Sequence, residues 1–322
     1  CTDALEMASI LINVKPGDEV IAPSYTFVST VNAFVLRGAK IVFVDSMRDS
    51  PNMDVSKIEE LITPKTIAIL PVHYAGIASD MDAIMEIAKK NNLFVIEDAA
   101  QAIDSYYKGK VLGSIGDFGT FSFHETKNII SGEGGLLTIN NEKYFDRAEI
   151  IREKGTNRSA FFRGEIDKYG WVDVGSSFLP SDIIAAFLYA QLENIDDIQG
   201  KRKHIWKQYH AQLKALEEKN YIQLPHIPEY ATNNAHIFYI VCKSLEERTN
   251  LILALKASNI DAVFHYLSLH KSPFYADKHD GRQLPNCDRF SDCLLRLPLF
   301  YELTDEMINK IVSVINKFYL KK

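Results

Sequence analysis

The first half of the chain alternates short, continuously apolar runs with longer segments of helical periodicity. Six runs have the length and composition of strands: 19–23, 40–45, 66–72, 93–97, 119–123 and 135–139. Because these runs are apolar at successive positions, they are typical of strands covered on both faces, as in a parallel sheet. Helical segments near 26–37, 55–62 and 81–91 lie between them and suit right-handed crossovers. We therefore predict an α/β fold with a mostly parallel sheet and helices on both of its faces.

The second half of the chain has a different order of elements. Ser181 begins a strongly helical segment that runs to about Glu217, with Asp182 as a first-turn acid. Farther on we expect a strand at 236–241, a helix near 246–257, a short strand at 262–264 and a helix near 305–318. With 322 residues available, we predict a large N-terminal domain, 1–200, and a small C-terminal α+β domain, 201–322. The chain does not begin with methionine, so we expect that an N-terminal segment is missing.

Charge and composition argue against several classes of protein. A net charge of −6, with 24 % charged and 47 % hydrophobic residues, is typical of a soluble enzyme and disfavours nucleic-acid binding through a basic surface. No apolar run is long enough to span a bilayer and no signal peptide opens the chain, so we expect a cytoplasmic protein without membrane contact. The four cysteines lack CxxC spacing, which favours free thiols and suggests no metal site.

An aspartate, a serine and a lysine lie close to successive strand ends. Asp98 follows the run 93–97, Ser122 lies in the run 119–123, and Lys127 comes shortly after it. Ligands of open α/β sheets bind beyond the carboxyl ends of the strands. There a lysine can form an imine with the aldehyde of pyridoxal phosphate (PLP), an aspartate can keep the ring nitrogen protonated, and a serine can donate to the phosphate. The alternatives are a surface lysine and an aspartate that caps a helix.

Four other residues could complete a cofactor site, and each has a plain structural alternative. Thr2 and Asp3 precede an apolar helix whose N-terminus offers free amides to an anion, or they simply cap it. Phe27 follows a strand end and could stack on a planar ring or pack in the core. Gln101, three residues after Asp98, could donate to an oxygen on the ring or lie on the surface.

Two further clusters suggest a substrate site. His265, Tyr266 and His270 place three polar rings within six residues after a strand, which modestly favours a substrate wall over ordinary packed or surface side chains. A basic cluster comprises Arg152, Lys154, Arg158 and Arg163. Arginine makes two-point contacts with phosphate, so this cluster could meet a pyrophosphate, or it could be a solvated helix end. The segment 155–177 around it is long for a loop, so we expect a functional role or a partner chain.

These motifs occur together in one enzyme family. The chain resembles the PLP-dependent nucleotide-sugar aminotransferases of the DegT/DnrJ/StrS family. The matching segments, in the family's order, are 2–5, 23–27, 97–101, 121–128, 133–135, 265–270 and 296–300. The resemblance implies the aspartate-aminotransferase fold (PLP fold type I) with a seven-stranded sheet, and a homodimer with shared active sites.

The resemblance also assigns roles to residues. It implies that Lys127 binds PLP covalently, that Asp98 holds the ring nitrogen and that Phe27 stacks on the ring. It places Gln101 near the ring hydroxyl, and it places Thr2, Asp3 and Ser122 around the phosphate. In the wider family an asparagine at this position contacts the cofactor phosphate of the partner subunit. This chain has Ser177 there, as closer relatives do, so we expect Ser177 to contact the cofactor of the partner.

Within the family, the segments 123–128, 151–158, 161–164, 174–177 and 263–266 resemble one group of transaminases. Their reaction moves an amino group from glutamate to C4 of dTDP-4-keto-6-deoxyglucose, giving dTDP-4-amino-4,6-dideoxygalactose for enterobacterial common antigen. A related sugar dehydratase is disfavoured, because such enzymes carry histidine in place of Lys127. A non-catalytic sugar-binding or regulatory protein on the same fold is the rival from another class, and it would not need the set of Asp98, Ser122 and Lys127.

Overall fold

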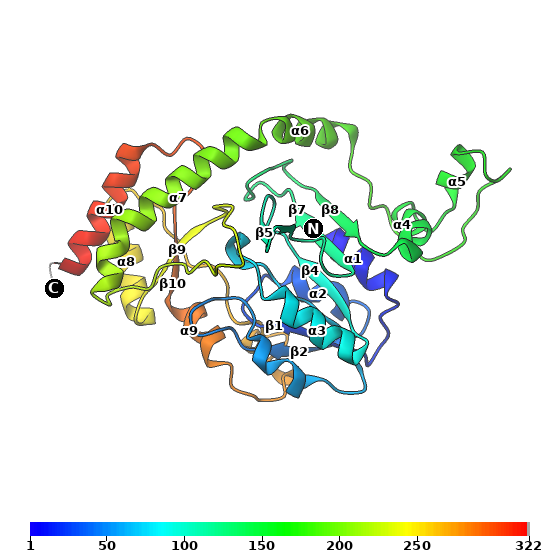
Figure 1. Ribbon diagram of the computed structural model, residues 1–322, viewed down its shortest axis with the longest axis horizontal. Coiled ribbons are helices and arrows are strands. Elements are labelled where there is room, and N and C mark those ends of the chain that lie inside the picture. Colours follow the sequence, from blue (N-terminus) through cyan, green and yellow to red (C-terminus); the bar gives the residue numbers. More distant parts are fainter. Residues whose placement is uncertain (321–322) are drawn as a thin grey trace.

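A six-stranded sheet forms the centre of the computed structural model, which describes residues 1–320 (Figure 1). Its strands are β1 (Glu19–Pro23), β2 (Lys40–Val44), β3 (Thr66–Ile69), β4 (Phe94–Asp98), β7 (Phe118–Ser122) and β8 (Gly135–Ile139). Their order across the sheet is β2-β1-β3-β4-β7-β8. Neighbouring strands are parallel except β7 and β8, which are antiparallel. The mostly parallel α/β fold predicted from the sequence is confirmed.

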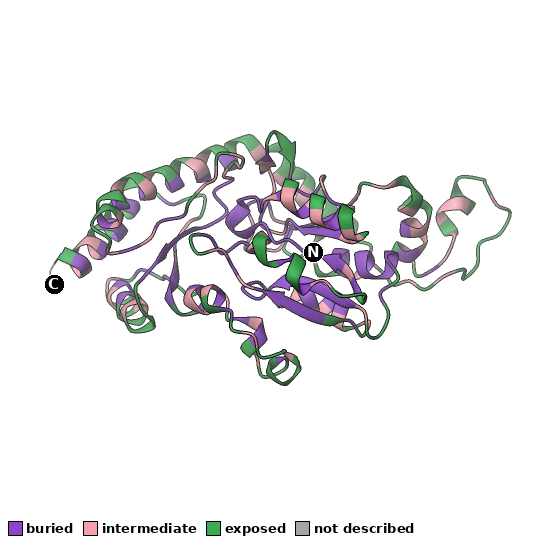
Figure 2. Ribbon diagram, turned by 60° about the horizontal axis from the view of Figure 1, so that its bottom comes forward, coloured by how far each residue is buried: buried purple, intermediate pink, exposed green. Residues whose placement is uncertain are grey.

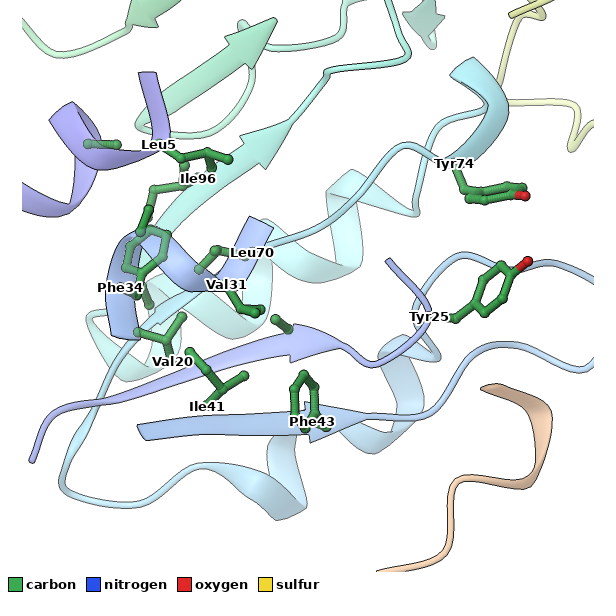
Figure 3. Packing of buried hydrophobic residues seen from close by; sticks show 14 of the residues in the cluster. Leu5, Val20, Tyr25, Val31, Phe34, Ile41, Phe43, Leu70, Tyr74 and Ile96 are labelled. Atoms are coloured by element: carbon green, nitrogen blue, oxygen red, sulfur yellow. The ribbon is translucent and has the colours of Figure 1, made fainter. Parts of the chain in front are cut away.

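Both faces of this sheet are covered, as the continuously apolar strands predict. On one face, Val20 and Ile41 belong to a core cluster with helices α1 (Thr2–Leu11) and α2 (Ser29–Val35), and Figure 3 shows Leu5 and Phe34 packed in it. On the other face, neighbouring strand residues such as Ile21, Val42 and Val95 pack with helix α3 (Met81–Asn91). Successive strand residues point to opposite faces, so this sheet separates two cores.

The second half of the chain is mostly helical and contains one small sheet. Its elements are α4 (Phe145–Arg152), α5 (Arg158–Phe162), α6 (Asp182–Glu193), α7 (Ile195–Glu218), β9 (Phe238–Val241), α8 (Leu245–Lys256), α9 (Pro285–Cys293), β10 (Leu294–Leu297) and α10 (Asp305–Leu320). Strands β9 and β10 pair antiparallel. A third core cluster is built from residues between Ile205 and Tyr319, mainly of α7, α8, α10 and these strands.

The short elements are a hairpin of β5 (Tyr106–Tyr107) and β6 (Lys110–Val111) and six 3-10 turns. The turns are η1 (Val55–Lys57), η2 (Glu59–Leu61), η3 (Tyr74–Gly76), η4 (Glu142–Tyr144), η5 (Leu269–Lys271) and η6 (Ala276–Lys278). The cysteines are free thiols. Among residues 1–320, no helix has the length and apolarity needed to cross a membrane.

Several expectations need correction. The helix expected at 55–62 is two separate 3-10 turns, and the expected short strand at 262–264 is one isolated bridge between Val263 and Arg296. Within residues 1–320 the sheet has six of the seven strands that the resemblance implied, because no other described segment pairs with β2 or β8. The domain boundary at residue 200 stays a prediction. Helix α9 belongs to the second half of the chain, but its Phe290 packs in the core of the first half, so the two halves share a core. Residues 321 and 322 of the predicted second domain lie outside the described part.

One region stands apart from these cores. Helix α5 and the loops beside it extend away from the sheet, and α6 has no buried residue (Figures 1 and 2). The side chains of Trp171 and Ile183 are 84 % and 83 % exposed. Large apolar side chains with this exposure, gathered in one part of a chain, are typical of a surface that binds another protein.

Candidate functional site

A cavity of about 420 Å³ lies at the carboxyl ends of β4 and β7, where the central sheet meets the second half of the chain. Its lining comes from the start of α1, the loop between β1 and α2, the loops after β4 and β7, and residues on both sides of β9 and β10. The residues with polar side chains are Cys1, Thr2, Thr26, Ser29, Thr30, Asp98, Gln101, Ser122, His124, Thr126, Lys127, Glu133, His236, His265, Tyr266 and Arg296. This is the sheet edge at which α/β proteins bind ligands.

Asp98, the last residue of β4, is 5 % exposed and is held by two donors. The hydroxyl of Thr30 donates to Asp98 Oδ2 at 2.6 Å, and the amide of Ala100 donates to Oδ1 at 3.1 Å. Two hydrogen bonds to different oxygens of one carboxylate restrict its rotation. The carboxylate of Asp98 therefore has a fixed position in the wall of the cavity.

Lys127 lies in the loop after β7 and lines the same cavity as Asp98. Burial lowers the pKa of the Lys127 amine and the charge of Arg296 lowers it further, while the Asp98 carboxylate opposes both. A lysine whose pKa is lowered has a larger neutral fraction near pH 7, and only the neutral amine attacks a carbonyl. The two residues that the sequence singled out are thus brought to one site, with an amine tuned toward reactivity.

Hydroxyl groups and a helix N-terminus gather at one part of the lining. Ser122 is the last residue of β7 and is 9 % exposed, and its oxygen accepts a hydrogen bond from the amide of His124 at 3.3 Å. Thr2, in the first turn of α1, donates to the hydroxyl of Ser29 at 3.0 Å. Free amides and hydroxyls at the positive end of a ten-residue helix suit a phosphate group.

Aromatic and amide side chains also line the cavity. Phe27 is 55 % exposed, lines the cavity and lies 6.1 Å from the ring of Tyr266, centroid to centroid. Gln101 donates to the Tyr266 hydroxyl at 3.0 Å and accepts from the amide of Ala75 at 2.7 Å. Phe27 therefore offers a face for stacking, whereas both ends of the Gln101 amide are already engaged.

His265 lines the cavity together with Tyr266, as the sequence predicted for a substrate wall. The two rings stack at 3.6 Å, and His265 Nδ1 is 2.6 Å from the hydroxyl of Tyr74, which Figure 3 shows beside Tyr25. Burial holds the pKa of His265 well below its usual range, and the charges of Arg296 and Lys127 lower it further. His265 is therefore neutral at physiological pH.

Two lining residues from the second half of the chain were not assigned a role from the sequence. His236 precedes β9 and is 4 % exposed, and Arg296 lies on β10. Burial keeps the pKa of His236 well below its usual range, with Lys127 and Arg202 adding to the shift. His236 is the first residue of the strand predicted at 236–241, and Arg296 lies in the segment 296–300 that contributes to the resemblance. However, only tertiary structure brings them to the carboxyl edge of a sheet far away in sequence.

Five predicted site residues do not line the cavity. Asp3 lies in the first turn of α1, next to Thr2. Ser177, Arg158 and Arg163 are exposed, and Arg163 pairs with Glu149 and Glu165 at 2.8 and 2.7 Å. His270 is 5 % exposed and its Nδ1 is 2.7 Å from the hydroxyl of Ser24, so it has a packing role in this chain.

The donor set of the cavity fits PLP. An amine with a lowered pKa, a buried carboxylate, a stacking ring and a cluster of hydroxyls at a helix N-terminus match the aldehyde, ring nitrogen, ring face and phosphate of PLP respectively. Among residues 1–320, no group of three or more histidine, cysteine and acidic side chains is placed to hold a metal ion.

Comparison with known proteins also indicates aminotransferase chemistry. The family model of the DegT/DnrJ/EryC1/StrS aminotransferases matches residues 1–316. GDP-perosamine synthase of Escherichia coli O157:H7 is 35 % identical to the chain over 325 residues, covering 100 % of this chain and 84 % of that protein. The solved structure of the aminotransferase TlmJ from Streptoalloteichus hindustanus is 26 % identical, with a TM-score of 0.91 over 100 % of this chain and 84 % of its own. NtdA of Bacillus subtilis, solved with the cofactor PMP bound, is 29 % identical, with a TM-score of 0.89 over 100 % of this chain and 72 % of its own.

Proposed function

Because the chain belongs to the DegT/DnrJ/EryC1/StrS family of PLP-dependent sugar aminotransferases, we propose that it transfers an amino group from L-glutamate to C4 of a nucleotide-linked 4-keto-6-deoxy sugar. The observation that carries this proposal is the joint placement of Lys127 and Asp98 in one cavity at the carboxyl edge of the sheet. A regulatory or purely sugar-binding protein has no need of a lysine amine whose pKa is lowered in such a place.

Asp98 and Lys127 have complementary tasks. When bound, PLP supplies an aldehyde that takes up amino groups and a ring that accepts electrons. The Asp98 carboxylate, fixed by Thr30 and Ala100, keeps a proton on the ring nitrogen. Lys127 Nζ takes up and returns the proton of the carbon that gains or loses nitrogen, as general base and then general acid. The lowered pKa of Lys127 suits both tasks near neutral pH.

The lining also orients the reactants. Ser122, Thr2 and Ser29 offer hydroxyls to the phosphate, and Phe27 covers one face of the ring. Neutral His265 and the Tyr266 ring form a wall that can hold the hydroxyl groups of a sugar.

We propose further that two copies of the chain form a homodimer with shared active sites. Support comes from the exposed apolar side chains of Trp171 and Ile183 and from the absence of any buried residue in α6. In a twofold dimer, the segment 155–177 of one protomer can reach the site of the other. Ser177, Arg158 and Arg163, which do not line the cavity of their own chain, would then meet the cofactor phosphate and the nucleotide pyrophosphate of the partner.

The proposed substrate is dTDP-4-keto-6-deoxy-D-glucose, and the product is dTDP-4-amino-4,6-dideoxy-D-galactose or its C4 epimer, for a cell-surface polysaccharide. A different nucleotide or amination at C3 is the alternative, and the similarity to GDP-perosamine synthase favours testing a GDP-linked sugar as well.

The purified protein, supplied with PLP and glutamate, should be incubated in parallel with dTDP- and GDP-linked 4-keto-6-deoxy sugars. NMR of the product then assigns the position and the configuration of the new amine. We expect 2-oxoglutarate and the 4-amino sugar in equal amounts with the dTDP substrate. No aminated sugar from either nucleotide would overturn the proposal.

A further inference from the structure

Arg296 is a cation in the cavity wall without a partner for its side chain. Its backbone pairs with Val263 (N to O 2.8 Å), which fixes the residue on β10. Its Nε is buried and has no hydrogen-bond partner, and the guanidinium makes no ion pair with any carboxylate of residues 1–320. Arg37 and Arg248 also have a buried, unpaired Nε, but neither lines the cavity. Arg296 as a whole is partly exposed, but a buried N–H donor without a partner is costly, so an anion that reaches this guanidinium would satisfy it.

The surroundings of Arg296 supply no such anion. The side chains of Lys127, His265 and His236, which line the cavity together with Arg296, carry no negative charge. The carboxylate of Asp98 is engaged by Thr30 and Ala100. Glu133, the other acid of the lining, has a side chain that is 80 % exposed. The anion must therefore come with a ligand.

We propose that Arg296 binds the carboxylate next to the amino group of the donor, glutamate, and the corresponding carboxylate of 2-oxoglutarate. This inference rests on the proposed function and names the residue that recognises the donor. In an amino acid the carboxylate is attached to the carbon that bears the nitrogen, so it lies close to Lys127 when that carbon reacts. In a nucleotide sugar the pyrophosphate is attached at C1, several bonds from C4. A guanidinium that lines the same cavity as Lys127 fits the first geometry.

The chemistry of the two groups also matches. A guanidinium presents planar N–H donors that meet both oxygens of a carboxylate at once. In the half-reaction with glutamate, the planar carboxylate accepts hydrogen bonds from the unpaired N–H groups of Arg296. In the half-reaction with the nucleotide sugar, the same N–H groups face sugar hydroxyls or water. Arg296 is thus a substrate-binding residue for one half of the reaction, and its loss must affect the two halves unequally.

The test uses the PLP-loaded enzyme and separates the two halves. Arg296→Gln removes the charge, and Arg296→Lys keeps the charge but loses the planar donors. Arg248→Gln is the matched control, because Arg248 is another partly exposed arginine of the second half of the chain with a buried, unpaired Nε, and it is outside the cavity. The measurements are the glutamate concentration for half-maximal conversion of cofactor absorbance, calorimetric binding of 2-oxoglutarate to the aminated enzyme, and calorimetric binding of dTDP.

Arg296→Gln should weaken glutamate and 2-oxoglutarate roughly 10- to 100-fold, the range for a charged hydrogen-bonded pair, with Arg296→Lys between it and wild type. Binding of dTDP should stay within about twofold. Unchanged glutamate and 2-oxoglutarate binding, or an equal loss of dTDP binding, would overturn the assignment of Arg296. A wild-type enzyme that neither converts glutamate nor binds 2-oxoglutarate would instead overturn the proposed function, and this inference with it.

Discussion

Asp98→Asn is the substitution that best separates chemistry from structure in this cavity. Asparagine has the same shape as aspartate, and its oxygen can still accept the hydrogen bond from the Ala100 amide, now 3.1 Å from Asp98 Oδ1. The negative charge is lost, and an amide nitrogen faces the Thr30 hydroxyl in place of the oxygen that now lies 2.6 Å from it. The ring nitrogen then has no carboxylate to keep it protonated.

The magnitude follows from the burial of Asp98. Removing one partner of a buried charge pair costs about 3–5 kcal/mol, and each 1.4 kcal/mol is a factor of ten in rate. We therefore expect kcat to fall roughly 10²- to 10³-fold. Thr30→Val, which keeps the carboxylate and removes one donor at 2.6 Å, should have a smaller effect, roughly 10-fold or somewhat more.

The assay is single-turnover conversion of the cofactor absorbance with saturating glutamate, at equal cofactor occupancy for each variant. Asp82→Asn is the matched control, because Asp82 is an exposed carboxylate paired with Lys108, and its loss should leave the rate unchanged. If Asp98→Asn reacts within about twofold of wild type, Asp98 does not hold the ring nitrogen.

Three further predictions concern stability and assembly. Burial lowers the pKa of Lys127, so the unfolded chain binds more protons and the cofactor-free protein gains stability as pH rises toward about 10.4; chemical denaturation of Lys127→Met should lack this gain. Phe34→Ala should lower the free energy of unfolding by about 3–5 kcal/mol, because Phe34 is fully buried, and an unchanged denaturation midpoint would contradict the packing. Ile183→Asp should shift the protein from dimer to monomer in light scattering, whereas a monomeric wild type would refute the dimer.

Much of the fold was predictable because the strands are buried on both faces. The runs at 19–23 and 135–139 coincide with β1 and β8, and the helix 81–91 coincides with α3. Such runs are set by local composition and periodicity, which a sequence displays directly. The capping role of Ser181 is also local, and its hydroxyl accepts from the amide of Ile184 at 3.3 Å.

The missed elements depend on contacts that are distant in sequence. Strand β10 pairs with β9, more than fifty residues earlier, and α9 directly precedes it without a loop between them. The helix expected at 55–62 failed because Glu59 and Glu60 begin a second, separate turn. Tertiary packing overrides local propensity at such places.

The candidate site likewise contains residues that the sequence indicated and residues that depend on contacts distant in sequence. The meeting of Asp98, Ser122 and Lys127 in one cavity was predictable, because the first two residues end strands, the third follows in the next loop, and the topology brings such ends together. Arg296 and His236 reach the same cavity from the other half of the chain, and their contribution depends on how the two halves pack. His270, predicted in the substrate wall, is buried beside Ser24 and does not line the cavity, and its role stays a prediction.

Peptide mapping by mass spectrometry after borohydride reduction of the PLP-loaded protein tests the central claim most directly. The claim is that the amine at position 127 is the group that holds the cofactor, opposite the carboxylate at position 98. The expected result is one modified peptide carrying the cofactor mass on Lys127, absent from Lys127→Ala. Cofactor mass on a different lysine, or a colourless protein without any adduct, would contradict the account.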